Sequence, residues 1–136
     1  MMKVTNRVLD AYSLIAFFEG EAGAERMIDV IKSARDAGCD LMFSVINWGE
    51  VYYITLREAG RDRAEEIAHL ISTLPIRLID VDLALVKQAA LYKAAKKMSY
   101  ADCIAASLAK LHKAELITGD EDFKQLEGEI KIFWID

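Results

Sequence analysis

The stretch 99–123, SYADCIAASLAKLHKAELITGDEDF, places a helix, a buried strand and a cluster of acids one after another. Ser99 has a side chain suited to capping a helix N-terminus. Apolar residues then recur at helical spacing, namely Ile104, Ala105, Leu108 and Leu111. The run 114–118, AELIT, predicts a strand, and three carboxylates follow within four residues. A helix leading into a buried strand is the building unit of α/β proteins.

The same alternation continues outward in both directions. Strands are expected at 6–10, 40–44, 76–80, 114–118 and 130–135. Helices are expected at 11–20, from about 24 to 38, from Asn47 to Ala59, at 64–74 before Pro75, after Asp82, after Ser99, and briefly from Asp120. In the helix after Asp82, we expect Leu83, Val86 and Ala90 to form the inner face. Strands alternating with helices predict a mainly parallel sheet of four to five strands covered on both faces.

Composition limits the class of protein. The 136 residues are expected to form one domain, 1–136, and 54% of them are hydrophobic. No apolar run approaches the ~20 residues of a membrane span, and the start of the chain lacks the features of a signal peptide. Cys39 and Cys103 have no metal-ligand spacing and are expected to be reduced, as in a cytoplasmic protein. The net charge of −5 argues against nucleic-acid binding through overall positive charge.

Four acids are predicted at or near helix starts, and three of them directly follow strands. They are Asp10, Glu50, Asp102 and Asp120. Each alone is explained by helix capping, since Asn47–Glu50 and Ser99–Asp102 have capping-box spacing. In a parallel sheet, however, these helix starts meet at one edge, where the carboxylates would repel. A divalent cation removes that repulsion, and oxygen ligands without His or Cys suit Mg²⁺ or Mn²⁺.

These motifs, taken in order, resemble the PIN domain family, and in particular the VapC-like toxin ribonucleases of toxin–antitoxin pairs. The segment 8–21, VLDAYSLIAFFEGE, resembles the family's opening strand and its aspartate–serine motif, with Tyr12 preceding Ser13. The segment 44–51, SVINWGEV, resembles the part that carries the family's glutamate, and 99–123 resembles its third and fourth acidic motifs.

The resemblance implies a PIN-like α/β/α fold and an endoribonuclease that uses Mg²⁺ or Mn²⁺ to activate water against RNA phosphodiester bonds. Asp10, Asp102 and Asp120 would be the metal ligands, completed by Glu50, with Asp122 as a weaker candidate. Ser13 and Thr118 would support the site by hydrogen-bonding a carboxylate or a phosphate; for both, a helix-cap role is an equal alternative.

The resemblance also implies partners: an RNA substrate, a cognate antitoxin and a second copy of the chain in a homodimer, with no membrane. Basic side chains are candidate phosphate contacts, namely Arg7, Arg57, Arg61, Arg63, Lys96 and Lys97. Two alternatives remain open. One is an RNA-processing nuclease without an antitoxin, and the other is a non-catalytic interaction module. A neighbouring gene for a DNA-binding antitoxin would distinguish a toxin from the RNA-processing nuclease. Metal-dependent cleavage would distinguish a nuclease from the interaction module.

Overall fold

Five parallel strands form the middle layer of the molecule, for which a computed structural model describes residues 6–136. The strands are Arg7–Leu9 (β1), Leu41–Ser44 (β2), Ile76–Ile79 (β3), Glu115–Thr118 (β4) and Lys131–Trp134 (β5). Their order is β3-β2-β1-β4-β5, and every neighbouring pair is parallel. The prediction of a mainly parallel sheet is therefore confirmed. The domain prediction also covers residues 1–5, which lie outside the described residues.

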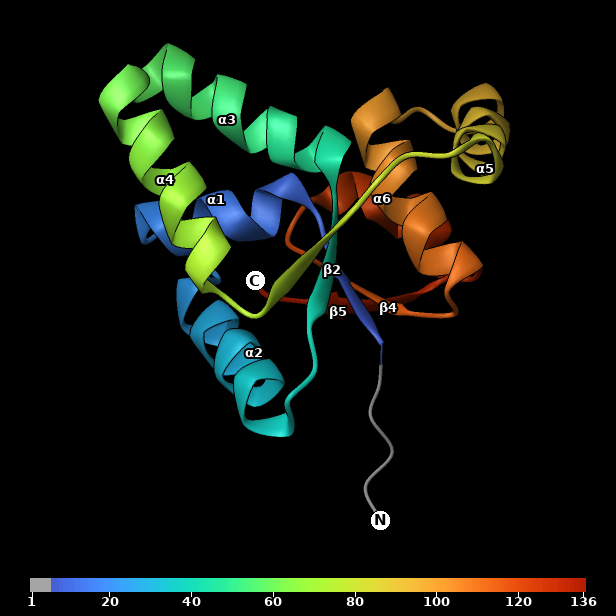
Figure 1. Ribbon diagram of the computed structural model, residues 1–136. Coiled ribbons are helices and arrows are strands. Elements are labelled where there is room, and N and C mark those ends of the chain that lie inside the picture. The colour runs from blue at the N-terminus through green and yellow to red at the C-terminus, as the bar shows by residue number, and fades with distance from the viewer. Residues whose placement is uncertain (1–5) are drawn as a thin grey trace.

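Helices cover both faces of this sheet, giving the three layers predicted (Figure 1). They are Ala11–Glu19 (α1), Ala24–Ala37 (α2), Val45–Ala59 (α3), Arg61–Thr73 (α4), Leu83–Ala95 (α5) and Tyr100–Leu111 (α6), with a 3-10 helix at Glu121–Leu126 (η1). Figure 1 shows α1, α2 and α4 on one side of the sheet and α5 and α6 on the other. Within residues 6–136, no helix combines the length and the apolarity that crossing a membrane requires.

Alternating strand residues build two separate cores. Val8 and Leu116 pack with α5, α6 and η1, whereas the next residues, Leu9 and Ile117, pack with α1 to α4. All four of these side chains are fully buried. Because side chains of a strand point alternately to opposite faces, the buried positions of a central strand must be apolar on both faces. This is why β1 and β4 each carry two consecutive apolar residues, Val8-Leu9 and Leu116-Ile117, after a polar first residue.

Two sequence predictions about helices are wrong. The helix after β2 begins at Val45 with Ser44 as its N-cap, not at Asn47, so Glu50 lies in its second turn. The inner face of α5 is formed by Leu85, Ala89 and Tyr92, whereas Leu83 is 82% exposed. The α5 sequence, LALVKQAALYKAA, is apolar around most of its circumference, so its periodicity does not identify the buried face.

The carboxyl ends of three neighbouring strands converge where the acids lie. β1 ends at Leu9 directly before Asp10, and β4 ends at Thr118, two residues before Asp120. β2, on the other side of β1, runs straight into α3. The helices α1, α3 and η1 therefore all start from this edge of the sheet, where ligand sites of open α/β sheets form.

Candidate active site

Asp10 lies buried at the centre of this edge, with 1% of its surface exposed. It is the N-cap of α1, and its Oδ1 accepts a hydrogen bond of 2.8 Å from the Ser13 backbone N–H. Its Oδ2 accepts a hydrogen bond from the Thr118 hydroxyl. Burial raises the pKa of Asp10 to about 7, with a smaller contribution from the charge of Asp102, although the bonds from Thr118 and Ser13 oppose the shift.

Ser13 and Thr118, the two predicted supporting residues, differ in what they do. The Ser13 hydroxyl donates to the Asp10 carbonyl at 2.9 Å, within the first turn of α1, which fits a capping role. The Thr118 hydroxyl donates to the Asp10 carboxylate and accepts a 3.0 Å bond from the Asp120 backbone N–H. Thr118 therefore connects the end of β4 to both Asp10 and the turn that presents Asp120.

The tightest group of carboxylates consists of Asp102, Asp120 and Asp122, each of which offers an oxygen within 4.8 Å of the others. Asp102 comes from the first turn of α6, where Ser99 accepts its backbone N–H. Asp120 caps η1 by accepting the Asp122 backbone N–H at 2.9 Å. Burial raises the pKa of Asp102 to about 7, and the charges of Asp120, Glu50 and Asp122 add to the shift.

Glu50 lies near this group and is held by a buried residue, Asn47, for which the sequence predicts only a helix-capping role. The Asn47 Nδ2 donates at 3.1 Å to both the Glu50 Oε1 and the Ala101 carbonyl, which ties α3 to the start of α6. The Ser44 hydroxyl donates to the Asn47 Oδ1 at 2.7 Å. Burial raises the pKa of Glu50, and the nearby Asp120 contributes.

Among residues 6–136, no basic side chain neutralises the acids. Within residues 6–136, no Lys or Arg forms an ion pair with Asp10, Glu50, Asp102, Asp120 or Asp122. Several carboxylates at one half-buried place without a cation raise each other's pKa, and for Asp102 this effect adds to the larger effect of burial. This donor set contains only oxygen, which fits Mg²⁺ or Mn²⁺ and not zinc.

Gly119, the residue before Asp120, lies close to the side chains of Tyr12 and Asp136. A Cβ atom at this position would lie 2.4 Å from Cε1 of Tyr12 and 2.9 Å from Oδ1 of Asp136. The Tyr12 hydroxyl donates to Asp136 at 2.8 Å, and this bond is the main reason that the pKa of Tyr12 rises to about 12. Any larger residue at this position, directly before Asp120, requires the Tyr12 or Asp136 side chain to shift. The sequence alone does not predict this contact.

Three of the six basic residues predicted to contact phosphates form ion pairs with other parts of the protein. Arg7 lies at the amino end of β1, away from the acids, where it pairs with Glu115 at 2.9 Å and stacks on Phe133. That placement contradicts the expectation that Arg7 reaches the substrate. Arg63 pairs with Glu66 and Glu19 on α4 and α1. Lys96 pairs with Glu129 at 3.3 Å.

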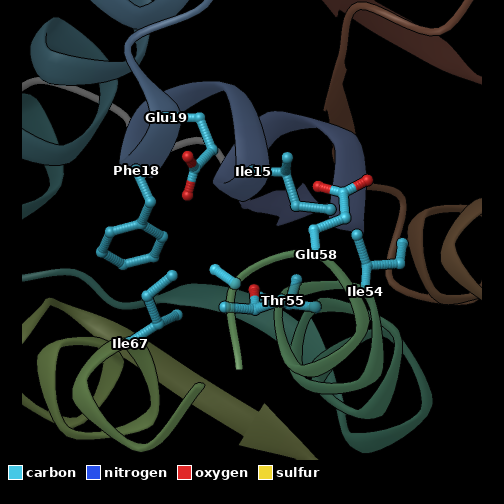
Figure 2. A pocket seen from close by; sticks show the side chains of 9 residues that line it. Ile15, Phe18, Glu19, Ile54, Thr55, Glu58 and Ile67 are labelled. Atoms are coloured by element: carbon cyan, nitrogen blue, oxygen red, sulfur yellow. The ribbon is translucent and has the colours of Figure 1, made fainter. Parts of the chain in front are cut away.

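A pocket of about 200 Å³ opens between α1, α3 and α4, separate from the acids. Its lining residues are Ile15, Phe18, Glu19, Val51, Ile54, Thr55, Glu58, Ala59 and Ile67. Figure 2 shows Ile15, Phe18 and Ile67 around the space, with the carboxylates of Glu19 and Glu58 beside them. The volume is below the ~300–1,000 Å³ of small-molecule sites, and fits one or two apolar side chains of another protein. Ile54 lies one helical turn beyond Glu50, so α3 contributes to both the pocket and the acidic edge.

The structure brings the predicted acids to one edge of the sheet, but it groups them differently from the sequence prediction. Asp122, the weaker candidate, lies in the tightest group, whereas both carboxylate oxygens of Asp10 are engaged by the protein. Asn47 and Tyr12 act between elements far apart in the sequence. Polar residues with such long-range partners look like ordinary helix residues in a sequence.

Comparison with known proteins gives one family and several similar folds. A family model described as PIN domain matches residues 7–129. The chain is similar to a toxin–antitoxin complex from Klebsiella pneumoniae, with 22% identity, a TM-score of 0.69, and coverage of 96% of this chain and 98% of that one. It is also similar to VapBC2 from Rickettsia felis bound to a promoter DNA fragment, with 13% identity, a TM-score of 0.77 and coverage of 96% and 98%.

A third similar structure is VapC20 of Mycobacterium tuberculosis, a toxin that cleaves the Sarcin-Ricin loop, with 17% identity, a TM-score of 0.72, and coverage of 93% of this chain and 98% of that one. No curated protein matches this chain. At these identities the likeness to solved structures shows the fold alone.

Proposed function

The chain belongs to the PIN domain family, and on that premise we propose that it is a Mg²⁺- or Mn²⁺-dependent endoribonuclease, the toxin of a type II toxin–antitoxin system. One observation carries the nuclease proposal. The carboxylates of Asp102, Asp120 and Asp122 lie within 4.8 Å of one another. No Lys or Arg among the described residues pairs with them, so the cluster lacks the positive charge that a divalent cation would bring.

Asp102, Asp120 and Asp122 would hold the ion directly, with Asp10 and Glu50 completing the pocket. When bound, a divalent ion lowers the pKa of a coordinated water and stabilises negative charge on a phosphodiester. The protein's own part is positional. Thr118 fixes Asp10 and the Asp120 turn, while Asn47 orients Glu50 toward the start of α6.

The test is cleavage of a mixed-sequence RNA panel in Mg²⁺, Mn²⁺ or EDTA. We expect cleavage with either metal, none in EDTA, and a loss of at least about 100-fold for Asp102→Asn. The matched control is Glu121→Gln, because Glu121 lies between Asp120 and Asp122 but points to solvent and pairs with Lys124. Cleavage that persists in Asp102→Asn, or that is lost equally in Glu121→Gln, would contradict the proposed site. Absence of both metal binding and cleavage would favour the interaction-module alternative.

For the antitoxin, the pocket between α1, α3 and α4 offers an apolar floor with two acids at its side. This chemistry fits a segment that inserts an apolar side chain and carries a basic residue next to it. The toxin–antitoxin complexes among the similar folds support such a partner. If a small protein encoded next to this chain is the antitoxin, it should bind and suppress cleavage. Glu58→Lys, at an exposed position of the pocket lining, should weaken that binding while cleavage persists. Absence of any such neighbour would favour the RNA-processing alternative.

The proposal includes a homodimer in the cytoplasm. Leu83 and Leu91 of α5 are 82% and 59% exposed, and we propose that they lie at the contact between the two copies, because the core of an interface is apolar. Cys39 and Cys103 are both free thiols, which agrees with a reducing compartment.

A further inference from the structure

Gln125, an exposed residue of η1, uses its whole side-chain amide on backbone groups. Its Oε1 accepts the Lys97 N–H at 3.1 Å, and its Nε2 donates to the Lys97 carbonyl at 3.1 Å. The Nε2 also donates to the Asp122 carbonyl at 3.0 Å. The side chain thus pairs with both backbone groups of Lys97, as a residue of a neighbouring β-strand would. At the same time it bonds to the backbone of η1 at Asp122.

These bonds connect the two segments that supply the carboxylates. Lys97 belongs to the connection between α5 and α6 and lies two residues before Ser99, the N-cap of the helix that carries Asp102. Asp122 belongs to the carboxylate group itself. Among residues 6–136, the only other polar contact between this connection and the segment following β4 is the ion pair of Lys96 with Glu129, which lies beyond η1.

We infer that Gln125 is a positioning residue that sets the separation of Asp102 from Asp120 and Asp122. The inference rests on the proposed metal site. Carboxylates this close repel one another when charged, and hydrogen bonds between the segments that carry them oppose their separation before a cation binds. A 3-10 helix of six residues supplies little rigidity of its own. Only an amide of this length can accept from one peptide and donate to two carbonyls at once.

The experiment compares Mn²⁺ binding by calorimetry for wild type, Gln125→Met and Lys96→Met. Gln125→Met keeps the length and approximate volume of the side chain but removes all three hydrogen bonds. Lys96→Met is the matched control, since it breaks the other polar contact between the same segments without touching Asp122. We expect Gln125→Met to weaken Mn²⁺ binding about tenfold, as loss of a residue that orients metal ligands typically does. Lys96→Met should stay within about twofold of wild type.

A second readout separates positioning from general loosening. The Mn²⁺ concentration for half-maximal RNA cleavage should rise by the same factor in Gln125→Met, while the rate at saturating Mn²⁺ stays within about twofold. Equal Mn²⁺ affinity in wild type and Gln125→Met, or an equal loss in Lys96→Met, would overturn the inference while leaving the proposed function standing. Failure of wild type itself to bind Mn²⁺ would overturn the proposed function and this inference with it.

Discussion

At the scale of single residues, Thr118 has a larger role than its place at the end of a strand predicts. Its hydroxyl is fully buried, donates to one acid and accepts from the backbone of another. A buried carboxylate that loses a donor keeps the cost of desolvation without compensation. Thr118 thus contributes both to stability and to the geometry of the acids.

Thr118→Val should therefore lower the free energy of unfolding by about 2 kcal/mol at pH 8, where Asp10 is charged, and by less at pH 5. Urea unfolding at the two pH values measures both. Thr55→Val is the control, because Thr55 is buried on α3 and its hydroxyl makes no hydrogen bond within the described residues. An equal loss in both variants would mean that the Asp10 contact contributes nothing specific.

The raised pKa values of Asp10 and Asp102 make the metal-free protein less stable at higher pH, where both carboxyls must lose their protons. Both carboxyls have a folded pKa of about 7 against an ordinary value of 3.8. Between these values the folded state binds more protons than the unfolded state, so the free energy of unfolding falls as pH rises, and levels off above about pH 7.5. Thermal unfolding in EDTA from pH 5 to 8 should show this decline, and saturating Mg²⁺ should reduce it. A melting temperature in EDTA that rises from pH 5 to 8 would contradict the raised values.

At the scale of elements, helix ends were predictable and helix contacts were not. Gly20, Gly38, Asp82 and Ser99 cap the helices as their residue types predict, because capping depends on neighbours along the chain. The start of α3 was misplaced because both Ser44 and Asn47 can cap, and the structure uses them together. The buried face of α5 could not be chosen from a helix that is apolar nearly all round.

Asn47 is the residue through which α3 and α6 hold each other at the site. Asn47→Ala removes hydrogen bonds to Ser44, Glu50 and the Ala101 carbonyl, all at a fully buried position. We expect a loss of about 2–3 kcal/mol in the free energy of unfolding. Ser99→Ala, which removes only the N-cap of α6, should cost about 1 kcal/mol. Chemical denaturation of both variants measures the two losses. A larger loss for Ser99→Ala than for Asn47→Ala would mean that the N-cap of α6, and not Asn47, contributes more to the contact between α3 and α6.

At the scale of the whole molecule, the sequence predicted the parallel sheet, since β1 and β4 are apolar on both faces and helices alternate with strands. It did not predict the order β3-β2-β1-β4-β5, which depends on pairing between segments about a hundred residues apart, such as Val8 with Leu116. That order places β1 and β4 side by side and so brings Asp10 to Thr118. The acidic edge was predictable from parallel strands alone, whereas the distances within it were not.

The exposed face of α5 leads to a prediction about assembly. The double variant Leu83→Lys with Leu91→Lys should change a dimer into a monomer in sedimentation velocity, because charges replace two exposed apolar side chains. Ile28→Lys, at a 53% exposed position on α2, is the control and should leave the dimer intact. A dimer that survives the double variant would place the interface elsewhere, for example on the exposed Tyr53 and Leu56 of α3.

The contact at Gly119 restricts the order in which this site can change during evolution. Because a Cβ at position 119 would collide with the Tyr12 ring, any larger residue there is disfavoured while the tyrosine remains. If position 12 first became small, alanine at 119 would become tolerable, although Asp136 would still have to move. We therefore expect the two positions to be epistatic: a lineage that replaces Tyr12 should tolerate substitutions beside Asp120 that are disfavoured in this chain.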